Sequence, residues 1–354
     1  MSALVQLGWN ERLQAAWDAL ADSEGLVPGR VFSQGRGGWF VRTEDEDLLA
    51  NLPGRFRSDT TPVVGDWVAV SERDGQDLGT IQHILPRSSS FSRKVPGDTT
   101  QEQVVAANID TVFLVAGLDG DFSPRRLERY LTLAWNSGAK PVVVLNKVDK
   151  CEDLIAVLTE CRQVALGVDL HTTSAKAGEG VDGLRQYTAE GTTVALLGSS
   201  GVGKSTIVNQ LLGTERMKTG DVREADKRGR HTTTHRELLV LPGGGCLLDT
   251  PGMREIQLWG SEEGLEETFS DVSGYFAECR FRDCKHSGEP GCAVAAAVES
   301  GELSAERVES YLELQAELSA LAQRREVRAK LERKKKDKKL AKLVKEVIKD
   351  SQKR

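Results

Sequence analysis

The pattern of apolar and polar positions divides the chain into segments of different texture. Residues 1 to about 25 carry four apolar side chains at helical spacing, which predicts a short amphipathic helix: Trp9, Leu13, Trp17 and Leu20. From Gly29 to about Pro96, short β-prone runs such as GWFVRT and PVVGDWVAVS alternate with glycine, proline and acidic turns. This pattern predicts a small antiparallel barrel of about five strands, and an OB-like barrel is favoured.

From about Asn108 the pattern becomes an alternation of strands and helices. The continuous apolar runs TVFLVAGL, PVVVLNK and TVALLG are typical of strands buried in a parallel sheet, and helical stretches separate them. We therefore expect a doubly wound α/β domain. The chain then divides into a helical extension (1–27), an OB-fold barrel (28–100), the α/β domain (101–262), a mainly helical domain (263–322) and a basic tail (323–354).

Composition and charge narrow the class of protein. The chain has 354 residues and 39% hydrophobic content, which predicts a multidomain soluble protein. It has no run of about 18 apolar residues and no signal-peptide pattern, so we expect a cytoplasmic protein with no membrane partner. The net charge is −6, but residues 324–354 hold 15 Lys or Arg against 5 Asp or Glu. This tail is predicted to be either a single exposed helix or a segment that orders on binding.

A phosphate-binding loop follows the run TVALLG. Residues 198–205, GSSGVGKS, match the pattern GxxxxGK(S/T) between a strand and a helix. Backbone N–H groups of such a loop surround phosphate oxygens, the lysine reaches the β and γ phosphates, and the serine hydroxyl binds magnesium. An ordinary glycine turn is the alternative. The predicted phosphate ligands are Gly198, Ser199, Ser200, Gly201, Val202, Gly203, Lys204, Ser205 and Thr206.

Two short motifs select guanine over adenine. Asn146, Lys147, Val148 and Asp149 (NKVD) follow the strand PVVVL. A carboxylate at this place can accept two hydrogen bonds from the ring N–H and amino group of guanine, a pattern that adenine does not offer. The next strand ends in a second motif, whose backbone N–H is expected to receive the guanine O6: Ser174, Ala175 and Lys176. Both motifs stand at the carboxyl ends of strands, where such sheets bind ligands.

The γ-phosphate is expected to meet two further segments. Asp249 and Gly252 belong to DTPG, where the carboxylate holds the magnesium shell and the glycine N–H contacts the phosphate; a plain β-turn is the alternative. The loop RGRHTTT supplies a magnesium-binding threonine, Thr234 or else Thr233, although a solvated loop would have the same composition. Met253 follows DTPG where many GTPases have a water-orienting glutamine, so slow intrinsic turnover is expected.

The order of these motifs differs from that of most GTPases. The phosphate loop usually comes first and the guanine motif last, whereas this chain has NKVD, SAK, GSSGVGKS, HTTT and DTPG. The sequence therefore predicts a circularly permuted GTPase domain. In this arrangement the loop after DTPG leads directly into the C-terminal domain, which suggests that the nucleotide state is relayed there.

Four potential metal ligands lie within 14 residues. Cys279, Cys284, His286 and Cys292 have the spacing C-x4-C-x-H-x5-C, which predicts a closed, structural zinc site. Unpaired core cysteines beside a surface histidine are the alternative. The remaining cysteines, Cys151, Cys161 and Cys246, are dispersed as core cysteines usually are.

Over residues 28–320 the combination of barrel, permuted motifs and cysteine spacing resembles the bacterial small ribosomal subunit biogenesis GTPases of the TRAFAC class. The resemblance implies an OB-fold, zinc on the four ligands above, GTP with magnesium, and binding of the small subunit and its rRNA during late maturation. It also implies that the particle accelerates hydrolysis and that His231 replaces the missing glutamine. We expect a monomer that exchanges GTP and GDP.

RNA contact has several candidates on the chain. OB barrels bind nucleic acid on an aromatic and basic face, for which the sequence offers Trp39, Phe40, Arg42, Arg55 and Arg57. A solvated barrel surface would explain the same residues, and the basic tail either attracts phosphates or only adds solubility. Two other functions remain open: a GTP-dependent switch with a non-ribosomal partner, and an RNA-binding assembly chaperone with a vestigial nucleotide site.

Overall fold

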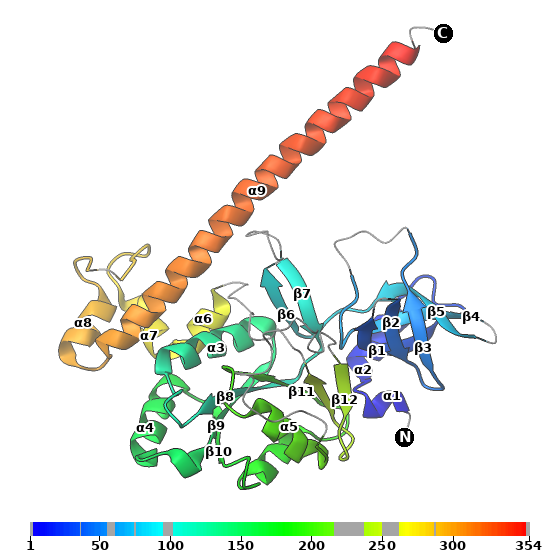
Figure 1. Ribbon diagram of the computed structural model, residues 1–354. Coiled ribbons are helices and arrows are strands. Elements are labelled where there is room, and N and C mark those ends of the chain that lie inside the picture. Colours follow the sequence, from blue (N-terminus) through cyan, green and yellow to red (C-terminus); the bar gives the residue numbers. More distant parts are fainter. Residues whose placement is uncertain are drawn as a thin grey trace, which may run out of the picture.

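The computed structural model describes residues 3–35, 37–54, 61–73, 76–94, 102–215, 237–249, 262–286 and 288–351. Three parts follow one another along the chain: a barrel, an α/β body and a helical region that ends in one long helix (Figure 1). The expected domain limits remain predictions.

Five strands close into the predicted barrel. Their order is β1-β2-β3-β5-β4, and β4 pairs again with β1, so the sheet is complete around the barrel. Seven fully buried side chains fill the interior: Val31, Val41, Leu48, Ala50, Val68, Val70 and Ile81. The bounds are β1 (Val27–Gly35), β2 (Gly38–Arg42), β3 (Asp47–Asn51), β4 (Trp67–Arg73) and β5 (Gln76–Ile84). The expectation of a five-stranded OB-like barrel is confirmed, but the barrel is not wholly antiparallel as expected, since β3 and β5 pair in parallel.

Six strands form the α/β part of a continuous sheet, which joins the barrel where the edge strand β12 pairs with β1. Their order is β10-β9-β8-β11-β13-β12, and all neighbouring strands are parallel except β12. The strand that precedes the phosphate loop, β11, lies inside this part of the sheet although three of the six strands come before it in the chain. The bounds are β8 (Thr111–Gly117), β9 (Lys140–Asn146), β10 (Asp169–Thr173), β11 (Thr193–Leu197), β12 (Glu237–Val240) and β13 (Cys246–Asp249).

Helices cover both faces of this sheet. Buried residues of α3 (Pro124–Ser137) and α4 (Leu154–Val164) pack in one core cluster with Val112 and Leu114 of β8. Residues of α5 (Lys204–Leu212) and the 3₁₀-helix η2 (Val181–Tyr187) pack in another cluster with Phe113 and Val115. Because side chains alternate along a strand, β8 contributes to both cores, which explains its continuous apolar sequence.

The N-terminal segment differs from the expected single helix. It forms two helices, α1 (Ala3–Gln6) and α2 (Glu11–Asp18), separated by Gly8 with a φ of 102°. A Cβ at Gly8 would lie 2.9 Å from the Gly191 carbonyl oxygen, so the close approach to the α/β body requires glycine. Asn10 then caps α2 by accepting a hydrogen bond from the Leu13 N–H. The prediction of one continuous helix is wrong because the chain turns at Gly8.

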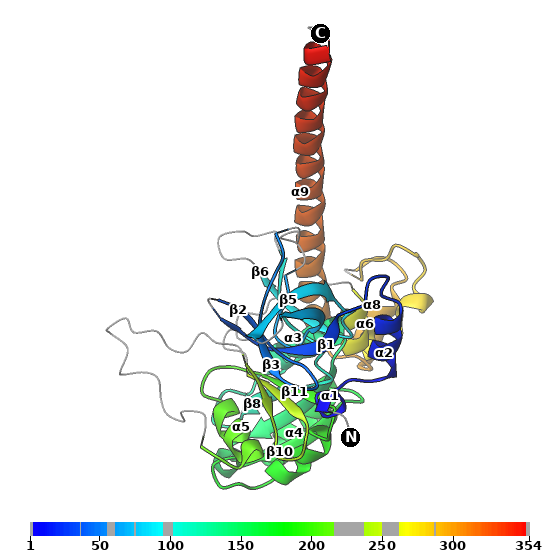
Figure 2. The same ribbon diagram turned by 90° about the vertical axis from the view of Figure 1, so that its right-hand side faces the viewer.

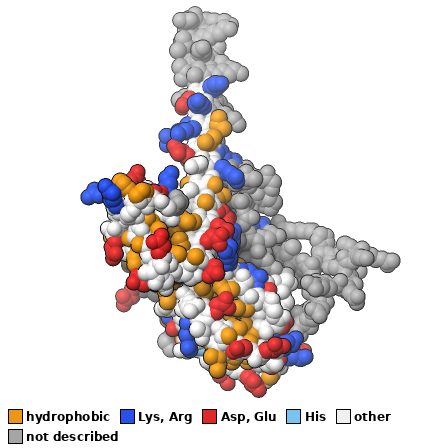
Figure 3. All heavy atoms as spheres, turned by 90° about the vertical axis from the view of Figure 1, so that its left-hand side faces the viewer, with side chains coloured by type: hydrophobic (Ala, Val, Ile, Leu, Met, Phe, Trp, Pro, Cys, Tyr) orange, Lys and Arg blue, Asp and Glu red, His pale blue; other side chains and the backbone are white. Residues whose placement is uncertain are grey.

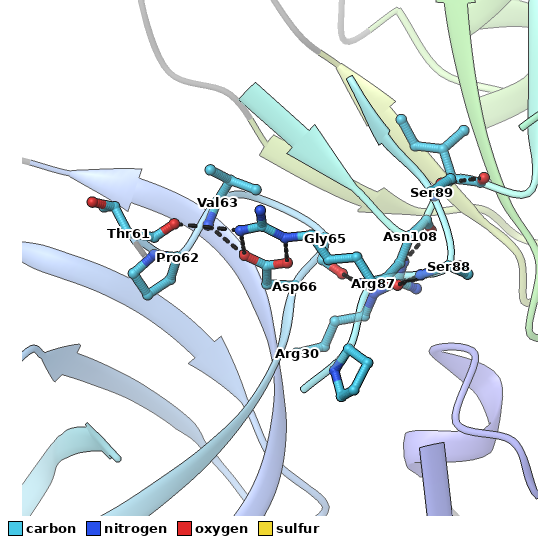
Figure 4. Close-up of polar contacts among 12 residues, drawn as sticks. Arg30, Thr61, Pro62, Val63, Gly65, Asp66, Arg87, Ser88, Ser89 and Asn108 are labelled. Carbon is cyan, nitrogen blue, oxygen red and sulfur yellow. Dashed lines mark hydrogen bonds and ion pairs between the residues drawn. The ribbon is translucent and has the colours of Figure 1, made fainter. Parts of the chain in front are cut away.

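A buried arginine joins the barrel to the α/β body. Arg30 of β1 is 1% exposed and donates hydrogen bonds to the Asn108 carbonyl at 3.0 Å, to the Thr193 hydroxyl at 2.8 Å and to the Leu7 carbonyl. Burial lowers the pKa of its guanidinium group. Asn108 completes the junction, since its side-chain N–H donates to the Gly65 carbonyl at 3.0 Å (Figure 4).

An ion pair supports the same junction from the barrel side. Arg87 donates two hydrogen bonds of 2.7 Å to the carboxylate of Asp66, which is fully buried (Figure 4). Asp66 also accepts from the Val63 N–H at 2.8 Å. The following hairpin, β6 (Ser90–Lys94) and β7 (Glu102–Ala107), forms a separate two-stranded sheet between the barrel and the α/β body.

The C-terminal region is helical. Its elements are α6 (Glu263–Thr268), α7 (Ser270–Ser273), the 3₁₀-helix η4 (Phe276–Glu278), α8 (Ala293–Ser300) and α9 (Ala305–Ser351). With 47 residues, α9 is about 70 Å long. Its first half buries one face at a spacing of three to four residues, Val308, Tyr311, Leu314, Leu318 and Leu321. The basic tail continues this helix away from the body, with Lys and Arg side chains along its described part (Figures 1, 2 and 3).

A second buried arginine holds α9 against the α/β body. Arg307 donates to Glu128 of α3 at 2.7 Å and to both carboxylate oxygens of Asp271 at 2.9 Å. It also donates to the Thr268 carbonyl at 2.7 Å, and its guanidinium group lies over the Phe269 ring at 4.4 Å. This one side chain therefore links α3, α6, α7 and α9.

We expect Glu128→Gln to lower the free energy of unfolding by about 3 kcal/mol, because Arg307 would keep a buried charge with one carboxylate fewer. Urea unfolding measures the change. Glu317→Gln is the matched control, since Glu317 forms a half-exposed pair with Arg129 at 2.6 Å and should contribute less than about 1 kcal/mol. Equal losses for the two variants would contradict the role of the buried pair.

Candidate functional site

The predicted phosphate loop connects β11 to α5. Three of its glycines have positive φ, at 149°, 83° and 100° for Gly198, Gly201 and Gly203. A Cβ at Gly198 would lie 2.2 Å from the Val115 carbonyl oxygen, and one at Gly203 would lie 2.2 Å from Nδ2 of Asn146. Glycine is therefore required at both ends of the loop, where the backbone passes close to neighbouring strands.

The lysine of the loop folds back over it. Lys204 Nζ donates to the Gly198 carbonyl at 2.7 Å and to the Ser199 carbonyl at 2.5 Å. Ser205 and Thr206 lie half-buried in the first turn of α5. The loop thus places an amine, two hydroxyls and a helix N-terminus together, which is the combination that binds phosphate groups.

Asn146 brings the predicted guanine and phosphate segments together. Its side chain is buried, and Nδ2 donates to the Val202 carbonyl of the phosphate loop at 2.8 Å. Oδ1 accepts from the Ala175 N–H and from the Thr173 hydroxyl, both at 3.0 Å. One amide therefore connects the NKVD, SAK and GSSGVGKS segments, which the sequence predicted as parts of one site.

The two charged residues of NKVD have different partners. Asp149 is exposed and accepts a hydrogen bond of 2.6 Å from the Ser174 hydroxyl, which lowers the pKa of its carboxyl group. An ionised carboxylate is the form that can accept hydrogen bonds from guanine. Lys147 has a left-handed backbone with a φ of 64° and pairs with Asp119 at 2.5 Å. Val148 begins the 3₁₀-helix η1 (Val148–Lys150), and Lys176 is exposed.

Asp119 lies beside the guanine motif but was not predicted from the sequence. This residue stands two positions after β8, at the carboxyl end of a strand next to β9. Its position after an apolar run was the available signal, but no motif marks it. A cavity of about 560 Å³ borders Asp119 and is lined by residues 118–120, 150–153, 156 and 157.

The γ-phosphate segments are only partly described. β13 lies parallel to β11 and ends at Asp249, so the chain brings this residue to the edge of the sheet where the phosphate loop begins. His231, Thr233, Thr234, Gly252 and Met253 lie outside the described residues, and their roles remain predictions.

The barrel residues proposed for RNA contact have mixed environments. Phe40 is 48% exposed, whereas Trp39 is half-buried and donates to the Pro62 carbonyl at 2.9 Å. Arg42 pairs with Asp47 at 2.5 Å, so its charge is already partnered. Arg55 and Arg57 lie outside the described residues.

The predicted metal ligands converge in the C-terminal region. The ligand atoms of Cys279, Cys284, His286 and Cys292 all lie within 4.8 Å of one another. His286 Nδ1 is 3.6 Å from the Cys279 sulfur and 3.7 Å from the Cys292 sulfur. This arrangement is compatible with a zinc ion held by three thiolates and an imidazole.

The surroundings of the cluster suit such an ion. The His286 ring stacks on Phe276 with ring centroids 4.2 Å apart, and burial lowers the pKa of the imidazole, which favours the neutral form that binds metals. Cys292 Sγ accepts a hydrogen bond from the Ala295 N–H and so caps α8. The Phe276 ring also packs against the Tyr311 ring of α9, with centroids 5.4 Å apart, so the cluster contacts the long helix.

Comparisons with known proteins decide the family. The family model for RsgA GTPase matches residues 84–259. The small ribosomal subunit biogenesis GTPase RsgA of Xanthomonas axonopodis is 47% identical over 334 residues, which cover 91% of this chain and 90% of the relative. The protein of the same name from Opitutus terrae is 46% identical over 335 residues, 91% of each chain. This chain belongs to the RsgA GTPase family.

Two solved structures agree with this membership of the RsgA GTPase family. YjeQ from Thermotoga maritima is 30% identical with a TM-score of 0.64, covering 83% of this chain and 98% of its own. YloQ, described as a circularly permuted GTPase, is 26% identical with a TM-score of 0.62, covering 85% and 98%. The protein is therefore a GTP hydrolase with a circularly permuted GTPase domain, as its motif order predicted.

One further family model, for ABC transporters, matches residues 181–348. That range includes the phosphate loop, and GxxxxGK(S/T) occurs in many nucleotide-binding proteins. The match therefore adds no function to that of the RsgA GTPase family. Across the part of the chain that the structure describes, no helix is long and apolar enough to span a membrane.

We expect one zinc ion per chain, measured by elemental analysis of the purified protein. Cys284→Ser should lose the zinc after dialysis against a chelator, because three ligands hold the ion less tightly than four. The matched control is Cys151→Ser, which changes a half-buried cysteine outside the cluster. Equal zinc content in the two variants after dialysis would contradict the predicted ligand set.

Proposed function

We propose that this GTPase acts in late maturation of the small ribosomal subunit. It binds the particle and its rRNA, and the particle accelerates hydrolysis. The main support is that Asn146 contacts both the SAK segment and the phosphate loop, so the segments predicted to bind guanine and phosphate lie together. In addition, relatives of this chain are named small ribosomal subunit biogenesis GTPases. The protein works as a monomer in the cytoplasm.

In this proposal different residues bind the base, the phosphates and the magnesium ion. Asp149 accepts hydrogen bonds from guanine, and the segment Ser174–Lys176, whose Ala175 N–H donates to Asn146 Oδ1 in this structure, supplies the backbone donor for O6 when the base binds. Backbone N–H groups of residues 198–203 and the Lys204 amine hold the phosphates. Ser205 and Asp249 would hold the magnesium ion, which when bound neutralises charge that develops on the phosphate oxygens.

Slow intrinsic hydrolysis follows from the residue after DTPG. Met253 has no group that orients water by hydrogen bonding. His231 takes over this role on the bound particle, and Thr234, or else Thr233, completes the magnesium shell. A slow enzyme that a partner accelerates is suited to a maturation checkpoint, because hydrolysis then reports that the particle is bound.

The nucleotide state is relayed to the zinc-binding region. The chain runs from Asp249 of β13 to α6, which starts only 14 residues later at Glu263. α6 packs on α3, where the Gly264 N–H donates to Asn136 Oδ1 at 3.1 Å. Arg307 then connects α3 and α7 to α9, so a shift of α6 would act directly on the packing of the zinc-binding region.

RNA binding uses two surfaces of different kind. The barrel offers the exposed aromatic ring of Phe40 as a platform on which a base can stack. Beyond Leu321 the helix α9 projects from the body, and its exposed basic residues such as Arg333, Lys334 and Lys338 add sequence-independent attraction to phosphates. A zinc ion on Cys279, Cys284, His286 and Cys292 would stabilise the segment between η4 and α8.

We expect purified small ribosomal subunits to raise the rate of GTP hydrolysis by about 100-fold or more.

Lys204→Ala should abolish hydrolysis with and without particles. His231→Ala should retain GTP binding but lose about 100-fold of the stimulated rate. The absence of such stimulation would favour a non-ribosomal partner, and unchanged turnover in Lys204→Ala would favour a chaperone with a vestigial site.

Hydrogen exchange tests the relay. We expect amides of residues 253–300 to exchange at different rates in the GTP-bound and GDP-bound protein, because α6 follows directly on the γ-phosphate segment. Amides of the barrel strand β4 serve as the internal reference. If residues 253–300 behaved like β4 in both nucleotide states, the relay would be excluded.

A further inference from the structure

An acidic residue outside the nucleotide motifs contacts the lysine of the guanine motif. Asp119 Oδ2 lies 2.5 Å from Lys147 Nζ, and the side chains are 29% and 24% exposed. The hydrogen bond from Lys147 lowers the pKa of the Asp119 carboxyl group, so this carboxylate is charged at neutral pH.

The backbone around this pair is constrained on both sides. Lys147 has a φ of 64°, a conformation that residues other than glycine rarely adopt. The Leu118 N–H donates to the Asn146 carbonyl at 2.8 Å, which joins the loop of Asp119 to the guanine motif. A Cβ at Gly117 would lie 2.7 Å from Asp119 Oδ1, so the carboxylate occupies space that only glycine leaves open.

The pair limits what Lys147 can do for a nucleotide. Its amine is held by Asp119, whereas Lys204 is the lysine that stands in the phosphate loop. The part of Lys147 that can contact a nucleotide is therefore mainly its chain of four methylene groups, which runs from the guanine motif toward Asp119. Such stems provide apolar surface to neighbouring groups while their charged ends stay fixed elsewhere.

We propose that Asp119 is a positioning residue for guanine recognition, because it holds the Lys147 stem as a wall beside the base that Asp149 reads. This inference rests on the proposed role of residues 146–149 in base binding. Asp119 itself contacts neither base nor phosphate. By fixing a long side chain before the nucleotide arrives, it removes part of the ordering cost that binding would otherwise carry.

The test uses the full-length protein and compares the affinity for GDP with steady-state hydrolysis of GTP. Asp119→Asn should weaken GDP binding about 3- to 10-fold, the range expected when one long side chain loses its preordered position. The KM for GTP should rise by the same factor with kcat unchanged, since the pair stabilises the bound ground state and the transition state equally. Isothermal titration calorimetry and a GTPase assay give the two numbers.

Asp169→Asn is the matched control. Asp169 pairs with Lys140 at 2.7 Å at the amino ends of β9 and β10, whereas Asp119 and Lys147 follow the carboxyl ends of β8 and β9, so the substitution breaks a similar ion pair away from the nucleotide. We expect no change in GDP affinity for this variant. Equal affinities of Asp119→Asn and Asp169→Asn, or a lower kcat at unchanged KM in Asp119→Asn, would overturn the proposal.

A double substitution tests whether Asp119 acts through Lys147. Lys147→Met keeps an unbranched apolar side chain but has no amine for Asp119 to hold. In that background Asp119→Asn should cause no further loss, and an additional loss as large as in the wild-type background would overturn the proposal. The base-reading role is tested separately, because Asp149→Asn should shift the preference from guanosine to xanthosine nucleotides whether or not Asp119 matters.

Discussion

The buried side chain of Asn146 is the interaction on which the nucleotide site depends. Its amide donates to the phosphate loop and accepts from the segment around Ala175, so three segments that are separate in the chain share one polar centre. A buried amide that loses its partners costs free energy, which favours the one arrangement in which all are present. Gly203 makes the contact possible, since a Cβ there would collide with the amide.

Two buried arginines, Arg30 and Arg307, likewise join separate segments of the chain at the two ends of the α/β body. The hydrogen bonds described for Arg30 go to carbonyl and hydroxyl oxygens of the N-terminal segment, the barrel and the body, whereas Arg307 is held by two carboxylates and a carbonyl. A buried guanidinium group needs most of its donors satisfied, so each arginine tolerates only one relative position of the parts that surround it. The barrel and the C-terminal helical region are thereby fixed to opposite sides of the nucleotide domain.

Where the sequence predictions failed, a contact between distant segments is the cause. A helix was predicted within residues 1 to about 25, but the approach of Gly8 to Gly191 separates α1 from α2, and α2 covers only Glu11–Asp18. The sequence did not predict Asp119 because a single aspartate after a strand matches no motif, and its proposed role depends on a pair with Lys147, 28 positions away. Arg42 was predicted as a candidate for RNA contact, but its guanidinium group pairs with Asp47 on the neighbouring strand.

The sequence by itself determined the family, the nucleotide, the permuted order of motifs and the five-stranded barrel, because each is written in short contiguous runs whose backbone chemistry is local. Only the tertiary structure decided how these runs meet. Asn146 and Val202 stand 56 positions apart, and Glu128 and Arg307 stand 179 apart. Such pairs form because β9, β8 and β11 lie side by side in the sheet and α9 returns to α3, and no local pattern encodes that order.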